Sequence, residues 1–157
     1  MEPIKSKLIL RTFDGTMKKL NLTPKCDDSK VEFQIKYYND EDILTEASII
    51  FEGVVAIDFE IIYFDSFSGS ELFGFYEIFD SEAKIEMIEK IFNNRLEGYL
   101  YNGDYNYDPN EENNMLNYRK PLNELFKQIE KYHLYQQQTL GGIFYILALN
   151  YKLLSDE

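Results

Sequence analysis

The chain contains few of the residues that cross-link small proteins or bind metals in them. Its 157 residues include one cysteine, Cys26, one histidine, His133, and no tryptophan. A single cysteine excludes an intrachain disulfide, which suits the reducing cytoplasm. There is neither a C-x-x-C pair nor a second histidine, so no zinc site is predicted, and no cofactor is expected.

Long apolar runs are also absent. No segment approaches 18 continuous apolar residues, so no membrane-spanning helix is expected. The apolar run within "MEPIKSKLILRTF" is too short for the hydrophobic part of a signal peptide. The length fits a single domain of residues 1–157, and the expected location is cytoplasmic.

Positive charge is scarce, and its distribution is uneven. Asp and Glu number 28 against 16 Lys and Arg, which gives a net charge of −12. This balance argues against binding to nucleic acid or to an anionic membrane and favours a basic protein partner or a bound cation. No Lys or Arg lies between Lys36 and Lys84, whereas that interval holds twelve acids: Asp40, Glu41, Asp42, Glu46, Glu52, Asp58, Glu60, Asp65, Glu71, Glu77, Asp80 and Glu82.

Alternation of apolar and polar residues predicts about nine strands. The predicted segments are 7–13, 17–22, 31–38, 46–53, 54–64, 72–79, 96–103 and two strands within 132–154. The second of these last two strands is a long one over 143–153. Helical spacing predicts a helix over 80–95 and a second over 120–132. Helical crossovers between the strands are missing, so the sheet should be mainly antiparallel. The fold class is α+β, a single domain dominated by a curved antiparallel sheet or sandwich with one or two helices.

The same periodicities predict which side chains are buried. In the helix these are Ile85, Ile88 and Phe92; in segment 54–64 they are Val55, Ile57, Phe59 and Ile61. Along 143–153 one face should carry Ile143, Tyr145, Leu147, Leu149, Tyr151 and Leu153. The "DGT" segment at 14–16 predicts a hairpin turn, and Gly74 predicts a bulge.

No catalytic or metal-binding motif is evident. His133 should lie on a strand beside Tyr135, Cys26 should be an ordinary thiol, and "SFSGS" at 66–70 is not a nucleophile elbow. The loop 104–115 places Asp104, Asn106 and Asp108 as an EF-hand would, but has Pro109 and Met115 where the EF-hand needs Gly and Glu. A solvated loop is therefore the default there, and calcium binding at 104–112 stays an open alternative.

The acidic interval provides the candidate binding site. Strand alternation places Glu46 and Glu52 opposite the apolar residues of their strand, and likewise Asp58 and Glu60. If the two strands are neighbours, they form one negative face that steers a basic partner toward it. Phe73 and Phe75 are the candidate aromatic anchors of this interface.

Three segments resemble small bacterial proteins, some of them similar to immunity proteins encoded beside secreted toxins. They are "VVAIDFEIIYF", the run "LFGFYEIFDSEAKIEMI" with its Ser81-to-Ile85 helix start, and the closing "HLY" and "FYILAL". The resemblance implies a cytosolic inhibitor that docks a toxin, with no catalytic residues. The alternatives are a small enzyme or ligand-binding domain with a carboxylate site, and a structural or regulatory subunit. Neither the partner nor the oligomeric state follows from the sequence.

Overall fold

The computed structural model describes residues 5–25, 28–61, 72–102, 124, 126–139 and 142–155. Within these ranges, the side chains of 72, 73, 91, 92 and 94–102 are not described. The chain divides into two compact units, Met1–Asp80 with Tyr132–Glu157, and Ser81–Lys131. The expected single domain of residues 1–157 stays a prediction.

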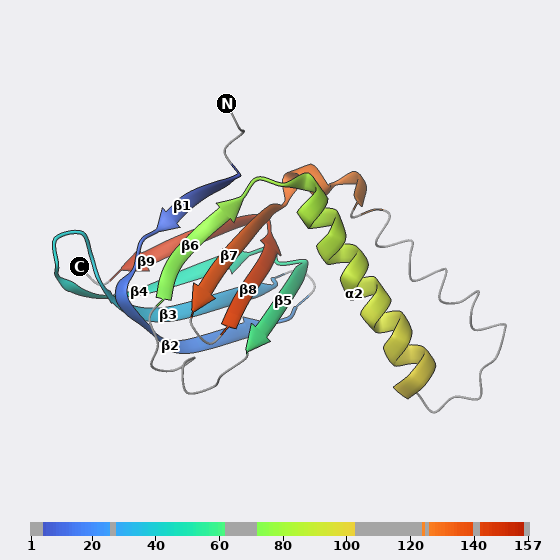
Figure 1. The fold of residues 1–157 in the computed structure, drawn as a ribbon, viewed down its shortest axis with the longest axis horizontal. Helices are drawn as coiled ribbons and strands as arrows, with labels where there is room; N and C mark the ends of the chain where they lie inside the picture. Colours follow the sequence, from blue (N-terminus) through green and yellow to red (C-terminus); the bar gives the residue numbers. More distant parts are fainter. Residues whose placement is uncertain are drawn as a thin grey trace. The chain divides into compact units, whose positions relative to one another are not determined.

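The described residues of the first unit form nine strands that pair antiparallel, arranged as Figure 1 shows. The strands are β1 (Ser6–Leu10), β2 (Phe13–Thr23), β3 (Lys30–Tyr38), β4 (Leu44–Glu52), β5 (Ala56–Ile61), β6 (Leu72–Ile78), β7 (His133–Thr139), β8 (Gly142–Ala148) and β9 (Asn150–Ser155). Their order is β5-β8-β7-β6-β2-β3-β4-β9, with β1 paired to β6. One residue pair, Gly15 with Leu72, joins the β5-to-β6 sheet to the β2-to-β9 sheet. The predicted antiparallel fold is confirmed.

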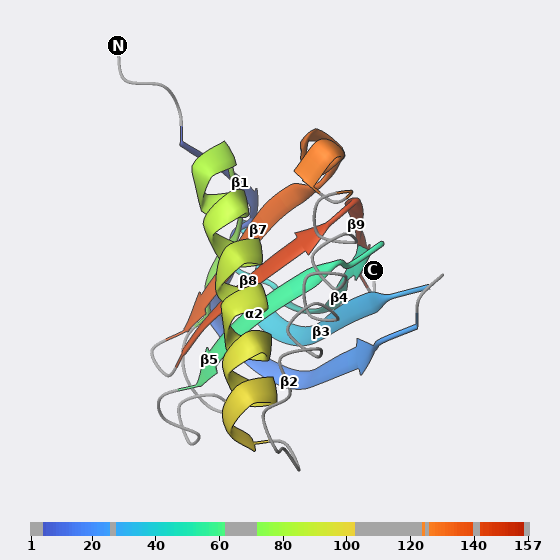
Figure 2. The same ribbon diagram turned by 90° about the vertical axis from the view of Figure 1, so that its right-hand side faces the viewer.

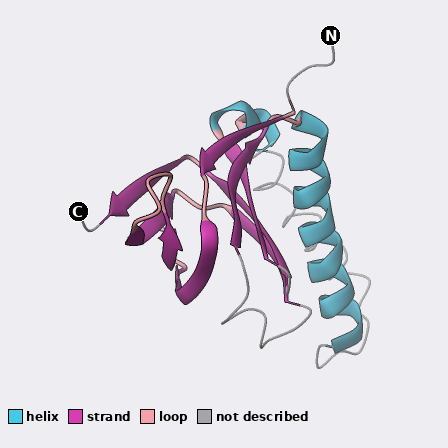
Figure 3. Ribbon diagram, turned by 60° about the vertical axis from the view of Figure 1, so that its left-hand side comes forward, coloured by secondary structure: helices cyan, strands magenta, loops and turns pink. Residues whose placement is uncertain are grey.

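The two sheets pack face to face (Figures 2 and 3). Aromatic side chains make up much of the core between them. Phe33 of β3 is fully buried, and its ring centroid lies 5.3 Å from that of Phe75 and 5.7 Å from that of Phe144. The ring centroids of Phe51 on β4 and Tyr135 on β7 lie 4.8 Å apart. Edge-on and offset ring contacts of this kind add to the free energy gained by burying apolar area.

Strand alternation predicts the core best in the middle of each sheet. Along β3 the side chains of Val31, Phe33, Ile35 and Tyr37 are all buried, as expected. In β5 the odd-numbered residues face the core as predicted, and Ile57 and Phe59 pack against it. The predicted burial of Val55 and Ile61 is wrong: they are 40% and 44% exposed, Val55 just before β5 and Ile61 at its end, on a strand that begins the strand order.

The "DGT" segment does not make a hairpin. β1 pairs with β6 rather than with β2, and Asp14 to Thr16 lie inside β2. The register of β2 against β3 shifts between Phe13 and Thr16, and Asp14 has a φ of 46°. The Asp-Gly pair therefore marks a bulge, which needs the same left-handed backbone as a tight turn. The bulge predicted at Gly74 is confirmed by a register shift and a φ of 126°.

The chain passes from one sheet to the other at a shared corner. The predicted strand over 143–153 is interrupted at Leu149, where β8 ends and β9 begins in the other sheet. The Leu149 amide donates to the carbonyl of Glu52, beside the crossing from β4 to β5. Gly53 has a φ of 62°, and a Cβ there would come within 2.6 Å of Leu149. The predicted common face over 143–153 is wrong, because β8 and β9 lie in different sheets on either side of Leu149; in β8 it is Phe144 and Ile146 that enter the aromatic core.

The second unit contains a helix longer than predicted, α2 (Ser81–Asn102). The predicted strand 96–103 is wrong for residues 96–102, which belong to this helix. No proline stops the helix there, and Gly98 lowers the stability of the helix by only about 1 kcal/mol relative to alanine. Ile88 is buried as expected, Ile85 is 42% exposed against expectation, and the side chain of Phe92 lies outside the described part.

Of the second predicted helix, 120–132, only the end is described. Residues 124, 126 and 127 are helical, and η1 (Ile129–Lys131) is a 3-10 turn. None of the described helices has the length and apolarity needed to cross a membrane.

Candidate partner-binding site

The two acidic strand pairs do not form one negative face. Glu46 and Glu52 lie on β4, seventh in the strand order, whereas Asp58 and Glu60 lie on β5, at the start of it. Each pair has the predicted parity, since Ala47, Ile49 and Phe51 are buried on β4 and Phe59 packs on the core from β5. The carboxylates therefore point away from the core on opposite sides of the sandwich. The condition for a shared patch, that β4 and β5 are neighbours, is not met.

The glutamates of β4 lie among lysines. Lys18 Nζ lies 2.6 Å from Glu46 Oε1, and Lys152 Nζ lies 3.1 Å from Glu52 Oε1. Lys36 and Lys30 of β3 stand directly opposite Glu46 and Glu52 in the ladder. The hydrogen bond and the charge of Lys18 hold the pKa of Glu46 below its usual value. The outer face of β4 is therefore a mixture of both signs, because the distant Lys18 and Lys152 return to it.

The acids of β5 have different cross-strand neighbours. Asp58 is half-buried opposite Tyr145, and Glu60 is exposed opposite Ile143. Both of these neighbours on β8 are uncharged, in contrast to the lysines that stand opposite the β4 glutamates. The β5–β8 ladder therefore supplies no cation to the acids of β5.

Of the two aromatic anchors expected from the sequence, Phe75 is not a surface group. Phe75 is fully buried, with its ring against those of Phe33 and Phe51, so it cannot contact a partner. Its apolar surface instead stabilises the core. The side chain of Phe73 lies outside the described part.

His133 does meet a carboxylate. Its Nδ1 contacts Oε1 of Glu77 on β6, and Tyr135 follows on the same face of β7. The Glu77 side chain is mostly buried, while that of His133 is about half exposed. Burial, with the nearby charge of Glu77, raises the pKa of Tyr135 well above its ordinary value of 10.0. The sequence includes Glu77 in the acidic interval but gives no sign of its contact with His133, because only the pairing of β6 with β7 brings the two together.

Three segments considered in the sequence lie outside the described residues. They are Cys26, the "SFSGS" segment at 66–70 and the loop at 104–115. The ordinary thiol and the alternative of calcium binding at 104–112 therefore stay predictions.

The turn between β3 and β4 carries three consecutive exposed or half-exposed carboxylates, Asp40, Glu41 and Asp42, here called the turn carboxylates. Asn39 Oδ1 accepts hydrogen bonds from the backbone N–H groups of Glu41 and Ile43, at 2.9 and 3.0 Å. The Asp42 N–H donates to the Asn39 carbonyl at 2.9 Å. Asn favours such self-capped turns. None of the turn carboxylates forms an ion pair with a described lysine or arginine.

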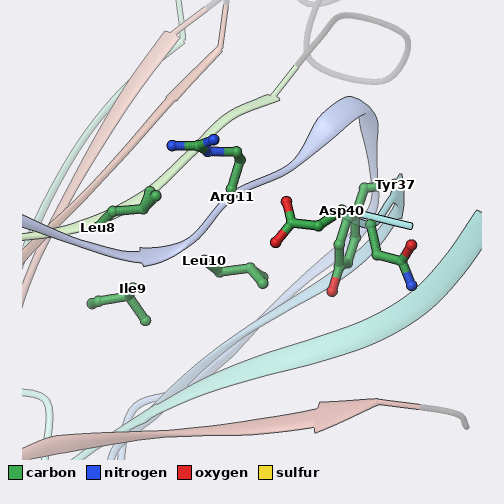
Figure 4. A pocket seen from close by; sticks show the side chains of 7 residues that line it. Leu8, Ile9, Leu10, Arg11, Tyr37 and Asp40 are labelled. Carbon is green, nitrogen blue, oxygen red and sulfur yellow. The ribbon is translucent and has the colours of Figure 1, made fainter. Parts of the chain in front are cut away.

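A pocket of about 490 Å³ adjoins this turn and is here called the Tyr37 pocket (Figure 4). It is lined by Leu8, Ile9, Leu10, Arg11, Tyr37, Asn39 and Asp40. Figure 4 shows the three apolar residues on one side and Tyr37 with Asp40 on the other. Burial, and secondarily the charge of Asp40, raise the pKa of the Tyr37 phenol. Sequence reasoning included Asp40 in the acidic interval but had no signal for the approach of β1 to this turn.

A smaller pocket of about 330 Å³ lies on the β4 face, lined by Lys18, Gln34, Ile35, Glu46, Ala47, Ser48 and Leu154. Its carboxylate is already bound to Lys18. It therefore offers less to a cationic ligand than the Tyr37 pocket does. No group of three metal-binding side chains occurs in the described part of the chain.

The fold and these surfaces define an antiparallel β-sandwich in which lysines neutralise the β4 carboxylates but, within the described residues, form no ion pair with the turn carboxylates. Comparisons with protein-family models, curated proteins and solved structures give no match.

Proposed function

We propose that this chain is a protein-binding domain that docks a basic partner through exposed carboxylates, in the manner of an immunity-type inhibitor of a toxin. The observation that carries the proposal is the set of turn carboxylates, held in place by Asn39, without a lysine or arginine partner in the described structure, and next to a pocket. Fixed carboxylates attract a cationic surface without the entropy cost of ordering a loop.

The chemistry fits an inhibitor of an enzyme that acts on anionic substrates. Such an enzyme presents lysine and arginine side chains to its substrate, and carboxylates of another protein compete for the same cations. A net charge of −12 adds long-range attraction, which raises the rate of encounter. Asp58 and Glu60 belong to the proposed interface as a second acidic region, on β5.

The test begins with the partner. The purified chain, immobilised, captures proteins from lysate of its source organism, and the captured protein is purified and its association rate measured as salt is raised. We expect a steep fall of the association rate with salt. Asp58→Lys with Glu60→Lys should slow association without lowering the unfolding temperature. A rate that is independent of salt and unchanged in this variant would show that the acidic surface is only a solvated one.

A second candidate function, a small enzyme, is favoured by one observation. The contact of Glu77 with His133 is the arrangement in which a carboxylate orients a histidine for proton transfer. Neither residue lines the two pockets described above. If the chain is an enzyme of this kind, Glu77→Gln and His133→Gln remove its activity while leaving partner capture intact. In a binding protein, both substitutions leave the association rate unchanged.

A further inference from the structure

We infer that the Tyr37 pocket receives the side chain of a lysine or arginine from the partner protein, with the ammonium or guanidinium group between Tyr37 and Asp40. This inference rests on the proposed function and specifies which group of the partner binds in the Tyr37 pocket. It commits to a protein side chain because the pocket opens beside Glu41 and Asp42, which only a larger partner can contact at the same time.

The apolar wall suits the methylene stem of a basic side chain. Leu8 is 37% exposed, and Ile9 and Leu10 pack their inner parts against the core. Lysine and arginine bury their aliphatic stems along apolar surfaces while keeping the charged group in a polar environment. A stem laid along Leu8 and Leu10 would cover apolar area that is now in contact with water.

The polar wall offers oxygen atoms to a cation. Tyr37 is only 5% exposed, and its hydroxyl has no hydrogen-bond partner among the described residues, although it belongs to the pocket wall. The hydroxyl itself is not enclosed, since Gln137 Oε1 is the one enclosed side-chain polar atom without a partner among the described residues, so a ligand in the pocket can reach it. The hydroxyl oxygen can accept from an ammonium group, and the Asp40 carboxylate supplies the opposite charge.

Asp40 is held in position before any ligand arrives. Asn39 bonds the backbone on both sides of the turn, through the N–H groups of Glu41 and Ile43. The ladder of β3 with β4 runs without a break up to Tyr38 and Leu44. The backbone that carries Asp40 therefore loses little freedom when a cation binds, which favours affinity.

Arg11 provides a way to distinguish a cationic ligand from an anionic one. Its guanidinium lies over the ring of Phe13, 5.8 Å from the centroid, and in Figure 4 it points away from Asp40. It does not neutralise Asp40 by an ion pair within the described structure. A cation in the pocket is repelled by Arg11, whereas an anion would be held by it. Removal of Arg11 therefore shifts affinity in opposite directions for the two kinds of ligand.

The experiment uses small probes and does not need the partner. N-acetyl-lysine methylamide, its arginine counterpart and the uncharged N-acetyl-norleucine methylamide are titrated into the isotope-labelled full chain, and amide and tyrosine NMR shifts are followed. We expect saturable shifts at Leu10, Tyr37 and Asp40 with lysine or arginine, at millimolar affinity, and none with norleucine. Asp40→Asn should weaken binding about tenfold, the loss typical of a charge-assisted hydrogen bond.

Matched variants decide the outcome. Asp42→Asn removes the same charge from the same turn, tolerates the φ of 62°, and should leave the affinity within about twofold, the effect of a screened distant charge. Tyr37→Phe should weaken binding and Arg11→Gln should tighten it. Absence of saturable shifts in the folded wild-type chain, equal effects of Asp40→Asn and Asp42→Asn, or weaker binding in Arg11→Gln would overturn the inference. Tighter binding of 1,4-diaminobutane than of both basic amino-acid probes would replace the protein side chain by a free amine.

The two experiments distinguish an error about the Tyr37 pocket from an error about the proposed function. If the probes do not bind but the captured partner still associates in a salt-dependent way, only the anchor pocket is wrong. If the probes bind but no salt-dependent partner exists, the pocket is real and the proposed function is wrong.

Discussion

Carboxylates on β4 and carboxylates on the turn before it lie a few residues apart in the sequence, yet they differ in their neighbours. Glu46 and Glu52 each contact a lysine within 3.1 Å, and further lysines stand opposite them on β3. Asp40, Glu41 and Asp42 have no such partner in the described structure and adjoin a pocket. A strand residue has cross-strand neighbours at about 5 Å, whereas a turn residue has none on its outer side.

The difference shows that a count of acids along a sequence does not locate a negative surface. The interval from Asp40 to Glu82 contains no lysine or arginine, but the sheet returns Lys18 and Lys152 to it from both ends of the chain. Only acids at positions without cross-strand neighbours of opposite charge keep an uncompensated field. For this protein, the turn is therefore a better candidate for partner contact than the β4 face.

The largest expected effect is on the association rate. Asp40→Asn with Asp42→Asn and Glu46→Gln with Glu52→Gln change the net charge of the chain equally. At low salt we expect the turn pair to slow association with the captured partner about tenfold, and the β4 pair less than about twofold. Stopped-flow measurements on both variants give the comparison. Equal slowing would mean that net charge alone steers the encounter.

The next effect concerns the stability of the turn. Asn39→Ala removes two side-chain hydrogen bonds to the backbone and should lower the free energy of unfolding by about 1–2 kcal/mol. Urea denaturation measures it. The control is Ser29→Ala, which removes one uncharged hydrogen bond, to the carbonyl of Val54, and should cost about 1 kcal/mol. If Asn39→Ala costs no more than the control, the turn carboxylates are not held by Asn39.

The ion pairs of β4 should contribute little to stability. Lys152 is well exposed, so Lys152→Met should cost at most about 1 kcal/mol, and less at high salt. For Glu46 the folded pKa is lowered, so its contribution is present above its usual value of 4.5 and is lost as pH falls through the folded value. The stabilities of wild type and Lys18→Met should therefore converge on acidification. Parallel curves in urea titrations at several pH values would show that Lys18 does not act through Glu46.

The smallest expected effect is on the pKa of Tyr37, and it reports how close the Asp40 carboxylate lies to the hydroxyl. Asp40→Asn should lower the pKa of Tyr37, because the charge of Asp40 is one cause of its elevation, while burial remains. Asp42→Asn should leave it unchanged. NMR titration of ring-labelled tyrosine follows the resonance of this residue separately. A Tyr37 titration that is identical in wild type and Asp40→Asn would place the carboxylate away from the hydroxyl.

Much of the fold was predictable because its signals are local. The buried side of β3, the parity of β4 and β5, and the bulge at Gly74 follow from alternation and glycine positions alone. Predicted strand boundaries were wrong where a sequence pattern fits two structures. The segment "DGT", for example, suits a bulge within a strand as well as a hairpin turn between two strands. The apolar run over 143–153 could not reveal its interruption, because the corner at Leu149 depends on Gly53, which lies far earlier in the chain.

The charge, the absence of an intrachain disulfide and the apolar face of the central strands follow from the sequence alone, since composition and a two-residue period need no knowledge of distant partners. The folded arrangement of the strands was needed to show that Phe75 is core, that lysines neutralise Glu46 and Glu52, and that Leu8 to Arg11 meet Tyr37 and Asp40. These outcomes depend on strand order and register. Register is a choice among pairings of similar local energy, and it is settled by how the whole set of strands buries its rings together.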